Sequence, residues 1–208
     1  MDAPVSTLVL IGITCLISLV AMGNHKLLAG LIFWPPAIVR DRQWWRLLSY
    51  GFVHADGMHL LFNMFTLYFF GRAMEGFVNA HLGDWGFAFF YLSALVASIL
   101  PTFLRHREDP KYLALGASGA VLAVLFSFIL LKPWALIIVF VVPMPAIVYA
   151  ALFLGYSIWM DRRGAKDDRT NHGAHLAGAI YGVLFTVLME PRVVGYFLGQ
   201  LAHPSLGY

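Results

Sequence analysis

The sequence predicts an all-α integral membrane protein in which six hydrophobic helices cross the bilayer. Three observations support this fold class. Of the 208 residues, 60% are hydrophobic and only 12% are charged, which is about half the charged share of a typical soluble domain. The mean hydropathy is +0.75. Successive apolar runs approach the roughly 20 residues that a helix needs to cross the hydrocarbon core.

The expected helices cover residues 5–23, 58–78, 85–104, 113–131, 146–160 and 172–190. No basic segment precedes the first run, so a membrane helix fits better than a removed signal peptide, although Ala21-Met22-Gly23 leaves that alternative open. The long segment of residues 24–57 contains the cluster Arg42-Gln43-Trp44-Trp45-Arg46. Tryptophan and arginine together suit the headgroup level of a bilayer, so we expect this first loop to lie on the membrane surface.

The apolar run of residues 133–160 is too long for one helix and is interrupted by Pro143-Met144-Pro145. Proline ends a helix and disfavours the α conformation of the residue before it. We therefore expect residues 134–142 to form an apolar surface or re-entrant segment, and residues 146–160 to make the single crossing. Two crossings are the alternative, but residues 134–142 are too few to cross as a helix. The whole chain, residues 1–208, is expected to form one membrane domain.

Composition excludes several classes of function. The single cysteine, Cys15, excludes an intrachain disulfide and a cysteine-based metal cluster. The net charge of +3 arises in loops beside apolar runs, which favours anionic lipid headgroups over nucleic acid as the partner. The expected partner is thus the lipid bilayer, with no nucleic acid, and the sequence does not determine the oligomeric state.

The second, fourth and sixth expected helices run in the same direction, so their N-termini share one face of the membrane. Unusual polar residues lie just inside these N-termini: His59 and Asn63, Ser118, and His172 and His175. Counted from the preceding charged residue at 1.5 Å per residue, Asn63, Ser118 and His175 share a depth of roughly 10 Å. Polar groups at such depth default to a functional interpretation.

Small residues predict close contact between the fourth and sixth helices. Gly116 and Gly119 lie on one, and Gly178-x-x-x-Gly182 on the other, a spacing typical of tight helix packing in membranes. Such contact would bring the His175 imidazole to the Ser118 hydroxyl. A serine needs an adjacent base to act as a nucleophile, and the oxyanion of the tetrahedral intermediate needs hydrogen-bond donors. His59, Asn63 and the free N–H groups of a helix start supply candidates, so the set predicts acyl transfer.

Two other interpretations of these residues remain. Ser118 alone would fit a small-residue packing position. His172 and His175, three residues apart, could bind a metal together with His59, but no Cys, Asp or Glu lies at a matching depth to complete a familiar zinc site. We therefore expect no metal.

Four segments together carry a resemblance to a known family. They are "WR" at residues 45–46, "HADGMHLLFN" at 54–63, "GASGA" at 116–120 and "AHLAGAIYG" at 174–182. With six expected helices and a long first loop, the chain resembles the rhomboid intramembrane serine proteases from about Val5 to Glu190. The fold class that follows is a six-helix rhomboid-like bundle with a long membrane-surface loop between its first two helices.

The resemblance implies a Ser–His dyad with Ser118 as nucleophile and His175 as general base. It places His59, Asn63 and the Ser118 N–H in an oxyanion hole, with Gly116 beside them and His54 in a supporting role. His172 is expected either to contact substrate or to cap its helix. The implied substrates are transmembrane proteins, cut in or near their membrane segments, and no cofactor is implied. A non-catalytic escort protein of the same fold, or a small transporter or metal-binding membrane protein, is the alternative.

The sequence departs from the family pattern in two ways. Many members carry a tyrosine four residues after the serine, stacked on the histidine, where this chain has Leu122. Most of the 14 lysines and arginines lie on the expected active-site face, which the positive-inside rule would make cytoplasmic, whereas the resemblance implies an outward opening. Arg46 and Glu75 match structural residues of the family. The expected location is a bacterial-type inner (plasma) membrane.

Overall fold

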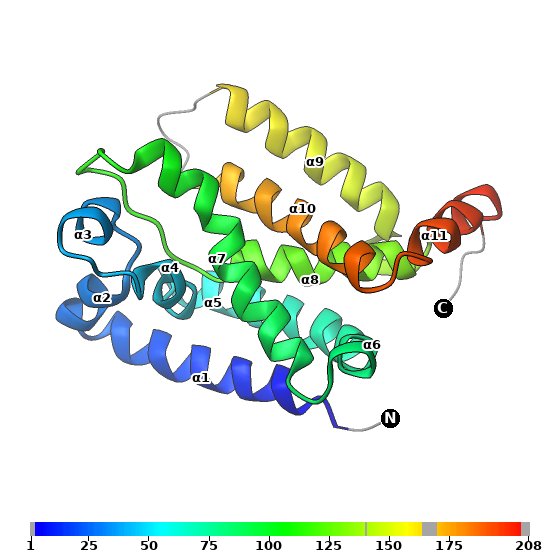
Figure 1. Cartoon of the computed structure of the whole chain (residues 1–208), viewed down its shortest axis with the longest axis horizontal. Coiled ribbons are helices and arrows are strands. Elements are labelled where there is room, and N and C mark those ends of the chain that lie inside the picture. Colours follow the sequence, from blue (N-terminus) through cyan, green and yellow to red (C-terminus); the bar gives the residue numbers. More distant parts are fainter. Residues whose placement is uncertain (1–2, 140, 164–169, 205–208) are drawn as a thin grey trace.

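The computed structural model describes residues 3–139, 141–163 and 170–204, and most of these residues are helical (Figure 1). In this part of the chain, three helices are long and apolar enough to cross a membrane: α1 (Val5–Met22), α7 (Gly86–His106) and α10 (His172–Met189). The chain is therefore an integral membrane protein with a mostly helical fold, as the composition predicts.

The other expected crossings are also mainly helical. Residues 58–78 fall within a continuous rod formed by α5 (Gly57–Thr66), the π-helical turn η2 (Leu67–Gly71) and α6 (Arg72–Leu82). The fourth and fifth correspond to α8 (Ser118–Leu131) and α9 (Ala146–Arg163). Three crossings thus meet the length and hydropathy that spanning requires, and the total of six stays a prediction.

The first loop contains four short helical elements: α2 (His25–Leu31), α3 (Pro35–Arg40), α4 (Arg46–Ser49) and the 3₁₀ turn η1 (Tyr50–Phe52). The Asn24 side chain caps α2 by accepting from the backbone N–H groups of its first turn. Arg46 donates to the carbonyl oxygens of Ala29 and Ile32 at 2.8 and 2.7 Å. Arg46 therefore connects two parts of the first loop, which fits the structural role expected for it.

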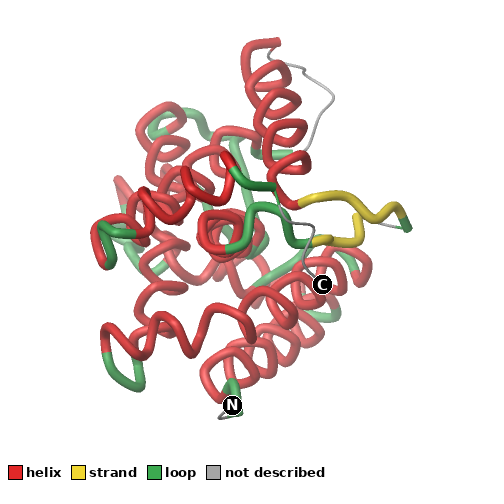
Figure 2. Tube along the Cα trace, turned by 90° about the vertical axis from the view of Figure 1, so that its right-hand side faces the viewer, coloured by secondary structure: helices red, strands yellow, loops and turns green. Residues whose placement is uncertain are grey.

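The segment after α8 is not helical, which corrects the all-α expectation. Strands β1 (Leu136–Val139) and β2 (Val142–Pro145) pair in antiparallel register, with Leu136 opposite Pro145. The hairpin projects from the helical body in Figure 2, and Ile138 and Val142 are exposed. The proline-rich run thus turns the chain back in place of a crossing helix. The final helix, α11 (Val193–Ala202), lies beyond the last expected crossing.

Helix α8 forms the centre of the bundle and packs directly against α10 (Figure 1). A Cβ atom at Gly178 would overlap the backbone of Gly119, and one at Gly182 would overlap that of Ala123. Both contacts advance four residues along each helix, so α8 and α10 run parallel. Gly119, Gly178 and Gly182 thus form this interface as predicted, whereas Gly116 precedes α8 and lies against His59 instead of α10.

Candidate active site

Ser118 is the first residue of α8, and the helix begins later than expected. Residues 113–117, expected to be helical, are instead held to the first loop, because Ala114 pairs with Phe33 and the Gly116 N–H donates to the Tyr50 carbonyl at 3.0 Å. These backbone bonds replace those of another helical turn. The serine consequently lies beside the unpaired N–H groups of a helix start inside the bundle.

Gly116 is required at its position for two reasons. Its φ of +108° lies in the region that L side chains rarely adopt. In addition, a Cβ atom there would come within 2.8 Å of His59 Nε2. The glycine thus admits the His59 ring directly against the backbone two residues before Ser118.

Ser118 and His175 form a hydrogen-bonded pair across the α8–α10 interface. Ser118 Oγ lies 2.7 Å from His175 Nε2, and both residues are half-buried. The N-terminus of α10 is fixed by Asn171, whose side chain accepts from the Ala174 N–H at 2.9 Å. His175 is therefore placed by a capped first turn, and Asn171, not His172, is the cap.

His54 connects three parts of the chain behind the serine. Its Nε2 accepts from the Ala117 N–H at 3.3 Å, and its Nδ1 lies 2.9 Å from Ser18 Oγ, which donates to the Phe52 carbonyl. These contacts fit the neutral tautomer with the proton on Nδ1. Burial lowers the pKa of His54 to about 3, which keeps the ring neutral at physiological pH. The predicted supporting residue thus holds the backbone that immediately precedes Ser118.

His59 and Asn63 share one face of α5, as their spacing predicts. Asp56 caps this helix by accepting from the His59 N–H at 2.8 Å, and Asn63 Nδ2 donates to the His59 carbonyl at 2.9 Å. The His59 ring lies 4.9 Å from that of His54. Asn63 is buried and His59 half-buried, so both belong to the polar cluster around the start of α8.

Helix α9 contributes two aromatic residues that the sequence analysis did not identify. The Phe153 ring lies 6.1 Å from that of His175, and the Tyr156 ring lies 5.5 Å from that of His172. His172 is buried, with its ring 6.1 Å from His175. Leu122 packs in the apolar cluster that includes Phe153. The ring partner missing at Leu122 is therefore supplied from another helix, and no local spacing signals it.

The described residues contain no group of three or more His, Cys, Asp or Glu placed to hold a metal ion. The His54 ring contacts that of His59, and the His172 ring contacts that of His175, which is also bonded to Ser118. A half-buried hydroxyl bonded to an imidazole, next to helix N–H groups, instead has the components of nucleophilic acyl transfer.

Comparison with known proteins supports the resemblance. A family model of the Rhomboid domain matches residues 41–192. The chain is 32% identical over 186 residues to Rhomboid-related protein 1 of Caenorhabditis elegans, covering 86% of this chain and 48% of that protein. It is 31% identical over 143 residues to the mitochondrial Rhomboid protein 1 of Saccharomyces cerevisiae, covering 67% and 40%. It is 32% identical over 83 residues to the putative rhomboid protease YdcA of Bacillus subtilis, covering 40% and 39%.

The chain spans about half or less of the length of these relatives. Several matching proteins are named as mitochondrial or chloroplastic. The names therefore do not support the expected bacterial-type plasma membrane, whereas an integral membrane location is supported by the helices themselves.

Proposed function

The chain belongs to the rhomboid family, and we propose that it is an intramembrane serine endopeptidase whose nucleophile is Ser118 and whose base is His175. The observation that carries this proposal is the 2.7 Å contact between Ser118 Oγ and His175 Nε2. A general base has to lie within about 2.6–3.2 Å of the proton it removes. Packing of α8 on α10 through glycines holds the pair at that distance.

In the proposed reaction, Ser118 Oγ attacks the carbonyl carbon of the scissile peptide bond while its proton passes to His175 Nε2. The imidazolium then protonates the leaving amine, and the peptide C–N bond breaks to give an acyl-enzyme. His175 next removes a proton from water, which attacks the ester carbonyl. The imidazolium then returns this proton to Ser118 Oγ as the ester C–O bond breaks, so that the carboxyl product leaves and Ser118 is restored. The two side chains thus account for every proton moved.

The developing oxyanion is assigned to the Ser118 N–H, the Asn63 amide and the His59 ring. Asn63 Nδ2 donates one of its two hydrogens to the His59 carbonyl, and the second hydrogen can be donated to the oxyanion. The His59 ring lies against Gly116, two residues from the nucleophile. Loss of one such donor costs about 3–4 kcal/mol of transition-state stabilisation in other hydrolases, so Asn63→Ala should lower kcat roughly 10²-fold or more.

The proposed substrates are transmembrane segments of other proteins, because a dyad inside a helical membrane bundle is reached from the lipid. Six crossings in a single domain of residues 1–208 are part of this proposal. A mobile cap formed by the charged fifth loop, residues 161–171, is also part of this proposal, and residues 164–169 of that loop lie outside the described residues.

The test compares wild type, Ser118→Ala and His175→Ala in proteoliposomes that contain a generic transmembrane fusion protein. We expect cleavage only by wild type, together with covalent labelling of wild type by a serine-reactive fluorophosphonate. The matched control is Ser93→Ala, because Ser93 is also a half-buried serine, paired with Tyr181 across α7 and α10. Labelling of wild type no faster than of Ser118→Ala would overturn the proposal and favour a non-catalytic escort protein.

A further inference from the structure

An open cavity with charged walls lies at the end of the bundle away from the dyad. It measures about 370 Å³ and is lined by Leu131, Lys132, Glu190, Arg192, Val193 and Tyr196. These residues come from the ends of α8 and α10 and from the start of α11. Thirteen residues separate Ser118 from Leu131 along α8, a rise of roughly 20 Å. The cavity is therefore separate from the dyad and lies where apolar helices end.

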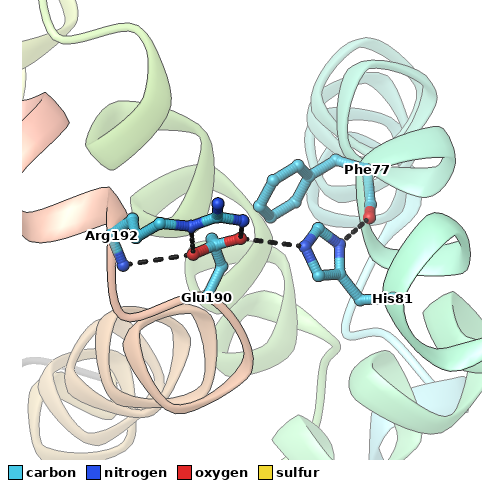
Figure 3. A network of polar contacts seen from close by, with 4 residues as sticks. All are labelled: Phe77, His81, Glu190 and Arg192. Carbon is cyan, nitrogen blue, oxygen red and sulfur yellow. Dashed lines mark hydrogen bonds and ion pairs between the residues drawn. The ribbon is translucent and has the colours of Figure 1, made fainter.

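The guanidinium of Arg192 is held in place by its own loop. Its Nε donates to Glu190 Oε1 at 2.7 Å and its Nη2 to Oε2 at 2.6 Å, as Figure 3 shows. The Arg192 N–H also donates to Oε1 at 3.1 Å. The side chain is nevertheless 89% exposed, so a pre-oriented cation faces the surroundings, with its Nη1 outside the contact to Glu190.

Helix α6 braces this carboxylate from the opposite side. His81 Nε2 lies 3.5 Å from Glu190 Oε2, and His81 Nδ1 lies 2.8 Å from the Phe77 carbonyl (Figure 3). Hydrogen bonds from Arg192 lower the pKa of Glu190 to about 2, so the carboxylate stays ionised. The arginine is thus fixed before any ligand arrives, which reduces the ordering cost of binding.

Lys132 supplies an uncompensated positive charge. Its side-chain ammonium makes no hydrogen bond or ion pair with any residue in the described parts of the chain, whereas its backbone N–H continues the α8 ladder by donating to the Phe128 carbonyl. Because Glu190 offsets Arg192, the cavity carries about one net positive charge, which matches one phosphodiester. Basic pockets between membrane helices at the headgroup level bind anionic lipid headgroups.

The apolar residues around the cavity favour a lipid over a soluble anion as its ligand. Helix α11 carries no charged residue from Val193 to Ala202, and its ten residues are too few to cross. Val194, Tyr196 and Leu198 are exposed on it, so an apolar surface borders the cavity. In a bilayer, this surface would place acyl chains beside the cavity mouth.

We propose that this cavity binds the headgroup of an anionic phospholipid, with the phosphate between Lys132 and Arg192. The upper part of the acyl chains would lie against Leu131, Val193 and Tyr196. A phosphatidylglycerol headgroup adds no cation beside Lys132, whereas choline does, so the site should prefer phosphatidylglycerol to phosphatidylcholine.

The test is native mass spectrometry of the full chain from micelles that contain equal amounts of phosphatidylglycerol and phosphatidylcholine. We expect wild type to retain phosphatidylglycerol preferentially. Retention of phosphatidylglycerol by Lys132→Gln should be about fivefold lower than by wild type. Lys132→Arg should retain as much phosphatidylglycerol as wild type, because the positive charge is conserved. The control is Arg72→Gln, which removes an exposed cation from α6 and should leave retention unchanged, and circular dichroism verifies that each variant is folded.

Equal retention of phosphatidylglycerol by Lys132→Gln and wild type would overturn the proposal, as would equal retention of the two lipids by wild type. Displacement of the lipid by millimolar glycerol phosphate would show a site for soluble phosphate and would equally overturn it. The result should be the same in Ser118→Ala, because this site does not depend on proteolysis.

Discussion

Replacing Gly178 with alanine should separate α8 from α10 and disrupt the bond between Ser118 and His175. A Cβ atom at position 178 would lie 2.7 Å from the carbonyl carbon of Gly119 and 3.0 Å from its Cα, with the carbonyl oxygen closer still. Ordinary van der Waals contact begins at 3.4 Å. The two backbones must therefore move apart by at least about 0.7 Å.

This displacement acts directly on the dyad. Gly178 lies three residues after His175, and Gly119 follows Ser118. Adding the shift to the 2.7 Å contact gives about 3.4 Å, beyond the usual range for an O–H donor. A misplacement of this order can cost roughly 10²-fold in rate, and overpacking of the interface should lower the free energy of unfolding by about 1–3 kcal/mol.

The assay measures the fluorophosphonate labelling rate and the cleavage of a transmembrane fusion by the Gly178→Ala variant. The matched control is Gly76→Ala in α6, where an added Cβ atom meets nothing within 4 Å. This change should keep full activity and stabilise the helix by about 0.5–1 kcal/mol. Labelling of Gly178→Ala within threefold of wild type would refute the inference that glycine packing sets the dyad distance.

Three further predictions concern His54, Glu75 and Phe153. Burial lowers the pKa of His54 from 6.5 to about 3, so its contribution to stability is complete above pH 6.5 and falls as the pH drops, by about 2 kcal/mol at pH 5. Thermal unfolding should show this fall, and an equal fall in His54→Gln would contradict it. Glu75 accepts from the N–H groups of Ser6 and Thr7 at 2.8 Å each, so Glu75→Ala should lower the free energy of unfolding by about 2–3 kcal/mol in a denaturation series. Glu75→Gln should lose less, and identical losses would count against the capping role. Phe153→Ala should reduce kcat roughly tenfold with little change in KM, because the His175 ring loses its neighbour. Phe153→Tyr should retain the rate, and wild-type kinetics in Phe153→Ala would exclude the positioning role.

The polar residues of the site can be predicted from the sequence, because polar side chains are rare within apolar membrane segments. A hydroxyl, an amide and imidazoles inside apolar runs are costly unless they face one another or water. Chain direction then places the starts of alternate helices on one face, and the glycines predict which helices touch. These arguments anticipated the pairing of Ser118 with His175, and the family match confirms the resemblance. The catalytic roles stay predictions.

Local patterns did not reveal the features that depend on distant backbone. Nothing in residues 113–117 signals a non-helical conformation, because the bonds that hold this segment come from Phe33 and Tyr50 in the first loop. Likewise, the bond between His54 and Ser18 of α1 joins residues 36 positions apart. The sequence predicts a segment at residues 134–142 that does not cross, but not the pairing of β1 with β2, because apolar β-branched residues fit both a strand and a buried helix.

Leu122, which stands where many rhomboid proteases carry a tyrosine, affects how the His175 ring is oriented. With an aliphatic side chain on α8, an aromatic neighbour of His175 comes from α9: Phe153, which is stacked on Tyr149 at 5.7 Å and lies 6.0 Å from Phe126 of α8. Contacts through glycine fix α10 to α8, but they do not fix α9. The distance between nucleophile and base thus depends on one pair of helices, whereas the orientation of the imidazole also depends on a third. For this reason the two variants should differ in their effect on stability. Gly178→Ala should lower both the labelling rate and the free energy of unfolding. Phe153→Ala should lower the labelling rate while the packing of α8 on α10 stays nearly unchanged.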